Sequence, residues 1–189
     1  MPRPKLHSDE AILSAAQHVL LSKGPATFTL TDVANAVGIS RAALIQRFRD
    51  KATLHNEVMK KMTQEVRDYF AAQPVEKGLV PLWAMLKELI GGMGEGEDTA
   101  GYLLLQWADI HDPALLELAR ERNRLVAEAI ELRLPDRPHA PSETASLIQA
   151  VIQGACMQWL IAREGSVAVF MTNQTRRALK KLYPEQNFD

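Results

Sequence analysis

Apolar side chains recur at intervals of three or four residues along almost the whole chain. Ile12, Ala16 and Leu20 follow this spacing near the start, and Leu54 and Val58 repeat it further on. Residues three or four apart lie on one face of a helix, so each such segment predicts an amphipathic helix. Because the alternation typical of strands is not found, the sequence predicts an all-α protein.

Short polar residues and glycines predict where these helices begin and end. Ser8 precedes two acids and is a candidate N-cap, and Gly24 is a candidate stop. Thr29 and Asp32 have the spacing of a capping box. Further candidate caps are Ser40, Asp50, Asp112 and Ser166. The predicted helices cover about residues 8–24, 29–38, 40–48, 50–73, 79–93, 99–110, 113–133, 142–163 and 166–182, and a glycine-rich loop lies at 91–101.

Charge is distributed unevenly along the chain. Residues 1–51 carry seven bases and four acids, a net charge of +3, which leaves −4 for the rest because the whole chain carries −1. A basic end on an acidic body is compatible with a polyanion-binding domain. The single Cys156 excludes an intrachain disulfide and a multi-cysteine zinc site. No signal peptide is recognisable and the apolar runs are shorter than the ~20 residues of a membrane span, so we expect a soluble, cytoplasmic protein.

Residues 29–48 contain the parts of a helix-turn-helix in order. A short helix is followed by Gly38, which suits the positive φ of a tight turn, and by Ile39, whose side chain is predicted to anchor the turn by packing into the core. In the second helix, Leu44 and Phe48 share an inward face. This helix is therefore predicted to enter the major groove of DNA with its opposite face.

The outward face of that second helix has small side chains and one amide. Ala42 and Ala43 let the helix approach base edges, and Gln46 can pair with adenine. Arg41 and Arg47 can reach either guanine or phosphate, and Thr31 a phosphate or a base edge. A generic three-helix bundle with small exposed residues is the alternative interpretation.

The stretch "TLTDVANAVGISRAALIQRFRDKATL" resembles the DNA-binding segment of the TetR family of bacterial transcriptional repressors. The positions that fit the family pattern are Thr29, Val33, Ala34, Gly38, Ile39, Ser40, Leu44, Phe48, Lys51 and Leu54. Ile45 stands where an aromatic is usual, and Arg47 where His is common. The resemblance implies that Lys51 and the helix that it begins hold a phosphate. The predicted DNA contacts are Thr29, Thr31, Arg41, Ala42, Ala43, Ile45, Gln46, Arg47 and Lys51.

The resemblance also implies two domains, a DNA-binding domain at 1–51 and an effector-binding and dimerisation domain at 52–189. The stretch "LLQWADIHDPALLELARERNRLV" distantly resembles repressors that control glycine-betaine synthesis. Candidate effector contacts, each with an ordinary core role as its alternative, are Met62, Tyr69, Trp83, Tyr102, Gln106, Trp107 and Trp159. Candidate dimer contacts are Leu147, Val151, Gly154, Ala155 and Leu179.

These patterns together predict a homodimeric one-component regulator that represses transcription from a pseudo-palindromic operator and is released by a small-molecule effector. We expect no enzyme activity, cofactor or metal, since the chain has no HExxH, P-loop or nucleophile-elbow motif. One alternative is a helical-bundle enzyme or carrier for small molecules. Another is a DNA-binding protein without an effector.

Overall fold

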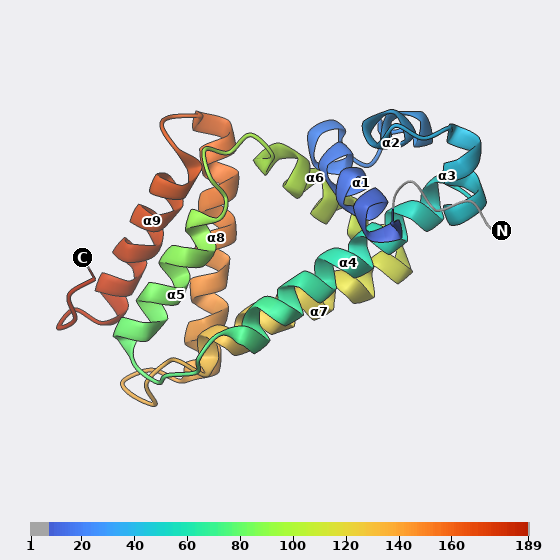
Figure 1. The fold of residues 1–189 in the computed structure, drawn as a ribbon. Coiled ribbons are helices and arrows are strands. Elements are labelled where there is room, and N and C mark those ends of the chain that lie inside the picture. Colours follow the sequence, from blue (N-terminus) through green and yellow to red (C-terminus); the bar gives the residue numbers. More distant parts are fainter. Residues whose placement is uncertain (1–7, 189) are drawn as a thin grey trace. The chain divides into compact units, whose positions relative to one another are not determined.

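Every regular element that the computed structural model describes, over residues 8–188, is a helix (Figure 1). The predicted all-α fold is confirmed. Residues 1–7, the first part of the predicted DNA-binding domain, lie outside the described residues. The helices are α1 (Asp9–Lys23), α2 (Leu30–Val37), α3 (Arg41–Phe48), α4 (Lys51–Ala72), α5 (Leu79–Gly91), α6 (Thr99–Asp109), α7 (Pro113–Glu131), α8 (Pro141–Ala162) and α9 (Val167–Leu182).

Side-chain caps begin the first three helices where the sequence predicts them. The Ser8 hydroxyl accepts the Ala11 N–H at 3.1 Å and begins α1. Thr29 and Asp32 form a complete capping box at the start of α2. The Ser40 hydroxyl accepts an N–H of α3. These contacts satisfy backbone donors that a helix leaves unpaired at its start, so the local sequence determines these boundaries.

The predicted caps of the later helices have mixed outcomes. The Asp50 carboxylate accepts the Thr53 N–H at 2.7 Å, and the Asp112 carboxylate accepts the Ala114 N–H at 2.9 Å, so both cap as predicted. Ser166 occupies the N-cap position of α9 but makes no capping hydrogen bond. Its hydroxyl instead donates to the Gly94 carbonyl oxygen at 3.3 Å, which corrects the prediction of a side-chain cap there.

Contacts divide the chain into two compact units. The first consists of the residues up to Val66 together with Gly101–Glu121, and the second of Arg67–Ala100 together with the residues from Arg122 onward. The assignment of separate functions to 1–51 and 52–189 stays a prediction.

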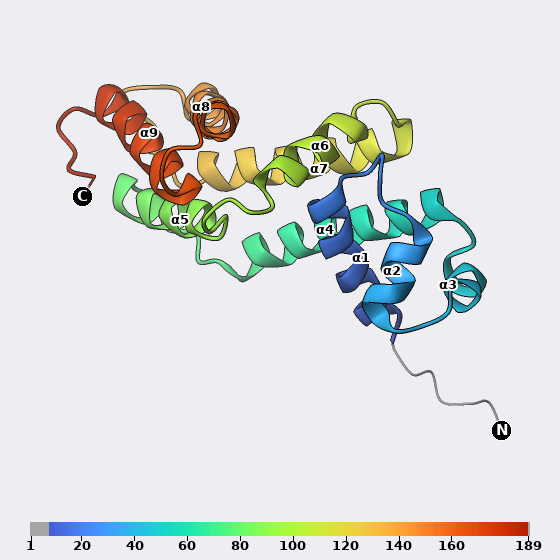
Figure 2. The same ribbon diagram turned by 90° about the horizontal axis from the view of Figure 1, so that it is seen from above.

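The first unit has one apolar core, to which both of its segments contribute. Ile12 and Leu20 of α1 and Leu44 of α3 are fully buried in it, and Leu105 and Leu115 from the second segment join them. Gly101 approaches α1 so closely that a Cβ atom there would lie 1.6 Å from the Leu21 carbonyl oxygen. Within this unit, α3 lies on the side opposite α6 (Figures 1 and 2).

The second unit is built around α5, α8 and α9, with the end of α7 against them. Helix α9 packs along α8 and also contacts α5 (Figures 1 and 2). Its core residues include Leu82 and Leu86 of α5, Ile130 of α7, Ile148 of α8 and Leu179 of α9. The interleaving of these apolar side chains, rather than local capping, fixes the arrangement of the unit.

Helix α8 tests the expectation that no segment of the chain is long and apolar enough to span a membrane. Over 22 residues, with a mean hydropathy of 1.4, it has the length and composition of a membrane span, contrary to the expectation that every apolar run is too short. Core helices of soluble proteins have the same properties, and α8 buries Ile148, Ala155 and Trp159 within its unit. This one helix is weak evidence for a membrane protein.

Candidate nucleic-acid interface

The turn between α2 and α3 has the predicted geometry. Gly38 adopts a left-handed conformation with φ of 74°, which glycine reaches at little cost. The Gly38 N–H donates to the Asn35 carbonyl at 3.2 Å, and the Ile39 N–H to the Ala34 carbonyl at 3.0 Å. Ile39 packs against the core of the first unit. The turn therefore fixes the direction in which α3 leaves α2.

Helix α3 turns one face to the core and the opposite face to solvent. Leu44 is fully buried and Phe48 nearly so, whereas Ala42 and Gln46 are exposed. Ala43 lies half-buried between the two faces. An exposed face of small side chains with one amide suits the major groove, where the amide can pair with a base edge. The contacts of these residues with DNA stay predictions.

Ile45 is half-buried and packs against the core of the first unit. Its side chain helps to pack α3 against that core. This position gives Ile45 a packing role, and its predicted contact with DNA stays a prediction.

Four of the predicted DNA contacts lie together at the start of α2, whereas Arg47 does not line this site. Thr29, Thr31, Arg41 and Lys51 line an open hollow of about 420 Å³, together with residues 26–28 and Leu30. The positive side chains of Arg41 and Lys51 line this hollow beside the N-terminus of α2, where the helix dipole also favours anions. The hollow is therefore a candidate seat for a DNA phosphate.

Lys51 is held in place by two neighbours. Its ammonium donates to the Ala26 carbonyl oxygen at 3.1 Å and lies 4.4 Å from the centre of the Phe28 ring. Phe28 is itself fully buried. These neutral contacts orient the ammonium without cancelling its charge. Phe28 is a supporting residue that the sequence reasoning missed, since no spacing rule links it to Lys51.

The capping box at Thr29 is tied to a neighbouring base. The Thr29 hydroxyl accepts the Asp32 N–H and donates to the Asp32 carboxylate, and Lys23 contacts that carboxylate at 2.5 Å. Hydrogen bonds from Lys23, and then from Thr29, lower the pKa of Asp32 to about 2. Thr29 thus has a structural role in addition to its predicted DNA contact.

Arg47 makes an ion pair that the sequence did not predict. A guanidinium nitrogen lies 3.4 Å from a carboxylate oxygen of Asp9. The pair joins α3 to the first turn of α1, across 38 positions of sequence. No local spacing rule links Asp9 to Arg47, so sequence reasoning missed this contact with α3.

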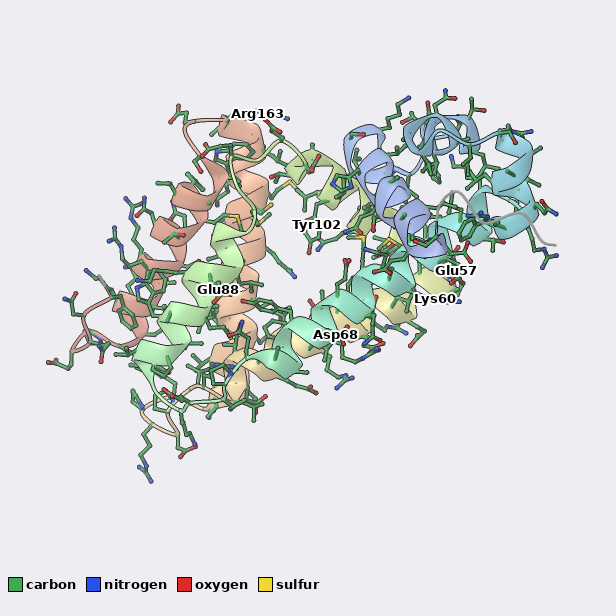
Figure 3. All side chains as sticks on the ribbon, viewed as in Figure 1. Glu57, Lys60, Asp68, Glu88, Tyr102 and Arg163 are labelled. Atoms are coloured by element: carbon green, nitrogen blue, oxygen red, sulfur yellow. The ribbon has the colours of Figure 1, made fainter. Side chains whose placement is uncertain are left out.

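The candidate effector contacts are divided between the two units. Met62, Tyr102, Gln106 and Trp107 belong to the first unit, and Met62 packs against its core. Tyr102, labelled on α6 in Figure 3, and Trp107 are exposed. Tyr69, Trp83 and Trp159 belong to the second unit. Neither unit by itself contains the whole predicted set.

In the second unit, the two buried tryptophans pack against protein groups. The Trp159 ring nitrogen donates to the Gly165 carbonyl at 3.0 Å, and a Cβ atom at Gly96 would lie 2.3 Å from the Trp159 ring. Trp83 packs edge-on against Phe188, and the Lys87 ammonium lies 5.5 Å from its ring centre. These contacts support the core interpretation of Trp159, whereas the Trp83 ring N–H has no hydrogen-bond partner within residues 8–188.

Tyr69 stands against Phe70 at the end of α4, with ring centres 5.1 Å apart. Burial, and then the nearby Glu88 carboxylate of α5, raise the pKa of the Tyr69 hydroxyl above its ordinary value. The shift keeps the phenol a hydrogen-bond donor over a wider range of pH than an ordinary tyrosine.

The candidate dimer contacts divide by exposure. Leu147 and Gly154 are exposed on α8, with open space where a Gly154 side chain would project, and Val151 is half-buried. Ala155 and Leu179 are buried within the second unit, so a part for them in a dimer contact stays a prediction. Sequence reasoning missed the other exposed apolar residues of these helices, which are Met157, Ile161 and Val169.

Comparison with known proteins agrees with this geometry. Residues 12–58, which include α2, the turn and α3, match the family model of bacterial regulatory proteins of the tetR family. No curated protein sequence matches the chain significantly.

Several solved structures share the fold. A protein described as a transcriptional regulator from Saccharomonospora viridis, solved in complex with choline, has 18% identity and a TM-score of 0.75, over 89% of this chain and 93% of that chain. A TetR transcription regulator from Haloarcula marismortui has 16% identity and a TM-score of 0.76, over 92% and 95%. The multidrug binding protein EbrR, complexed with malachite green, has 22% identity and a TM-score of 0.62, over 88% and 94%.

Proposed function

We propose that this chain, whose residues 12–58 match the family model of bacterial regulatory proteins of the tetR family, is a one-component repressor of that family that a small-molecule effector releases from its operator. The observation that carries the proposal is that α3, the proposed recognition helix, has one buried and one exposed face. Leu44 and Phe48 are buried, and Ala42 and Gln46 are exposed. The hollow lined by Arg41 and Lys51 supplies the accompanying phosphate seat. Proteins of this family are soluble DNA-binding regulators, and we propose a cytoplasmic location and no catalytic role.

The proposed repressor binds DNA as a homodimer. A single α3 reads only half of a pseudo-palindromic operator, and two copies would enter successive major grooves about 34 Å apart. The apolar residues that α8 and α9 expose, Leu147, Met157, Ile161 and Val169, supply a surface for a second copy. Gly154 has open space around it, so it leaves room for a close approach by the partner.

The proposed effector acts by favouring one of two conformations. It would stabilise a spacing of the recognition helices that does not fit the operator, and α4, which follows α3 directly, would transmit the change. The size of the response is bounded by the difference between the affinities of the effector for the two conformations. The choline and malachite green complexes of similar folds support a small organic molecule as the effector.

Trp83 supplies a reason to place the effector in the second unit. The Trp83 side chain is 5% exposed, and its ring N–H has no hydrogen-bond partner within residues 8–188. A buried donor without an acceptor costs free energy, and a ligand with an acceptor oxygen would recover it. This supports the prediction that Trp83 contacts the effector.

Genomic footprinting with the purified protein tests the proposal, because it identifies the operator and the genes beside it. We expect protected sites with two-fold related halves. Replacing both Arg47 and Lys51 with Ala should abolish binding to these sites and make any residual binding less dependent on salt, since fewer phosphates are neutralised. Unaltered affinity and salt dependence would contradict the assigned phosphate contacts.

A matched variant controls for the loss of two positive charges. Lys60 and Lys77 are surface bases in ion pairs, with Glu57 at 2.8 Å and with Asp136 at 2.6 Å. Glu57 and Lys60 are labelled on α4 in Figure 3. Neither lysine lies on α3 or lines the hollow. Replacement of both with Ala should leave operator affinity nearly unchanged.

The effector is tested by screening small molecules for a shift in thermal unfolding. A compound that raises the melting temperature of the protein should also release it from the footprinted operator. Compounds that stabilise the protein but leave operator binding intact would contradict the proposed release mechanism.

A further inference from the structure

Arg47 and Lys51, two bases of the candidate interface, differ in the groups that hold them. Its guanidinium faces the Asp9 carboxylate at 3.4 Å, and its side chain is 19% exposed while that of Asp9 is 53% exposed. Lys51 is held instead by a neutral carbonyl and an aromatic ring. The structure therefore places a carboxylate, of the same charge as a DNA phosphate, beside one predicted phosphate contact.

A carboxylate and a phosphate compete for the same guanidinium. Both accept charge-assisted hydrogen bonds from arginine, so a DNA phosphate gains full contact only when the carboxylate yields its place. The carboxylate also repels the incoming phosphate. Surface ion pairs of this kind are weak, which makes the exchange possible at a modest cost.

Resting on the proposed function, we propose that Asp9 holds Arg47 in an ion pair that must open on DNA, and so lowers the affinity for the DNA backbone regardless of sequence. Asp9 is then a tuning residue for DNA affinity that lies outside the helix-turn-helix. Since phosphate contacts carry no sequence information, Asp9 weakens binding to unrelated DNA as well as to the operator. This limits the occupation of the large excess of non-operator DNA.

Glu10 provides a matched control on the same helix turn. Like Asp9 it is an exposed acid in the first turn of α1, where both interact favourably with the helix dipole. The ion pair that joins α3 to this turn is the one between Arg47 and Asp9. Asp9→Asn and Glu10→Gln therefore remove the same charge at nearly the same place, and only the first opens the pair.

The experiment measures binding of the full chain to a labelled random-sequence duplex of about 30 base pairs over a range of salt concentrations. We expect Asp9→Asn to bind about threefold more tightly than the unmodified protein at low salt. The slope of log affinity against log salt should steepen by about one for each arginine that gains a phosphate. Glu10→Gln should give a smaller gain and an unchanged slope.

A double variant shows whether the gain passes through Arg47. Adding Asp9→Asn to Arg47→Gln should give no more than the small gain of Glu10→Gln, because the arginine that the carboxylate restrains is missing. Equal effects of Asp9→Asn and Glu10→Gln on affinity and slope would overturn the proposal, as would a full threefold gain in the Arg47→Gln background. Failure of the unmodified protein to bind any duplex would instead count against the proposed function itself.

Discussion

The two units begin their helices in different ways. In the first unit, the side chains of Ser8, Thr29, Ser40 and Asp50 each accept a backbone N–H at the start of a helix. In the second unit, α5, α8 and α9 follow Gly78, Ala140 and Ser166 without a side-chain capping bond. Local sequence thus determines the helix boundaries of the DNA-binding side, whereas long-range packing holds the other unit together.

The largest expected effect tests the close approach of Gly101 to α1 in the first unit. Gly101→Ala would place a methyl group 1.6 Å from the Leu21 carbonyl oxygen, so α6 must shift away from α1. We expect a loss of about 3 kcal/mol in the free energy of unfolding, measured by chemical denaturation. Gly91→Ala, in the second unit, meets no atom within 4 Å and serves as the control. Equal stability of the two variants would contradict the close approach.

The next prediction concerns a buried arginine that ties the second unit together. Arg133 is 3% exposed, and its guanidinium donates to the Ala129 carbonyl at 2.8 Å and to the Pro74 carbonyl at 2.6 Å. Arg133→Met keeps much of the volume but leaves the Pro74 carbonyl unpaired. We expect a loss of about 2 kcal/mol by chemical denaturation. Arg177→Met, at an exposed site of α9, should have little effect, and a similar loss there would weaken the argument.

A smaller effect compares the caps of the two units directly. Ser40→Ala removes the acceptor of the Ala43 N–H, which lies 3.1 Å from the hydroxyl oxygen, and should cost about 1 kcal/mol. Ser166→Ala removes no capping bond but only the longer, 3.3 Å hydrogen bond to the Gly94 carbonyl, and should cost about a few tenths of a kcal/mol. Thermal unfolding of both variants measures the difference. A loss at Ser166 as large as that at Ser40 would erase the contrast between the units.

The smallest effect is a dependence on pH. Because the pKa of Asp32 is lowered from 3.8 to about 2 in the folded chain, its contribution to stability is fully present above pH about 4. That contribution is lost as the pH falls through about 2. The melting temperatures of the unmodified protein and of Asp32→Asn should therefore converge below pH about 3. A constant difference across this range would contradict the lowered pKa.

What the sequence predicted well depends on residues close together in the chain. The Thr29 capping box, the Gly38 turn and the inward face of Leu44 and Phe48 arise from spacings of a few residues, and the structure confirms them. Helical periodicity likewise located α1–α9. These features need no knowledge of distant segments.

What the sequence could not predict depends on partners far apart in the chain. Asp9 meets Arg47, and Arg133 meets Pro74, across 38 and 59 positions, and no local pattern predicts either pair. For the same reason, the apolar spacing of α9 does not show that Leu179 is buried inside its own unit. An apolar residue on a helix indicates that its side chain is covered in the folded protein, but it does not indicate which neighbour covers it.

The contribution of residues 101–121 to the first unit has a consequence for synthesis on the ribosome. Leu105 and Leu115 complete a core that also contains Ile12 and Leu44, yet they are made only after residues 67–100. Until they emerge, the nascent DNA-binding helices have an apolar face without its final cover, which is open to chaperones and to proteases. A gene fragment ending at Val66 would encode the whole recognition helix but only part of the core that supports it.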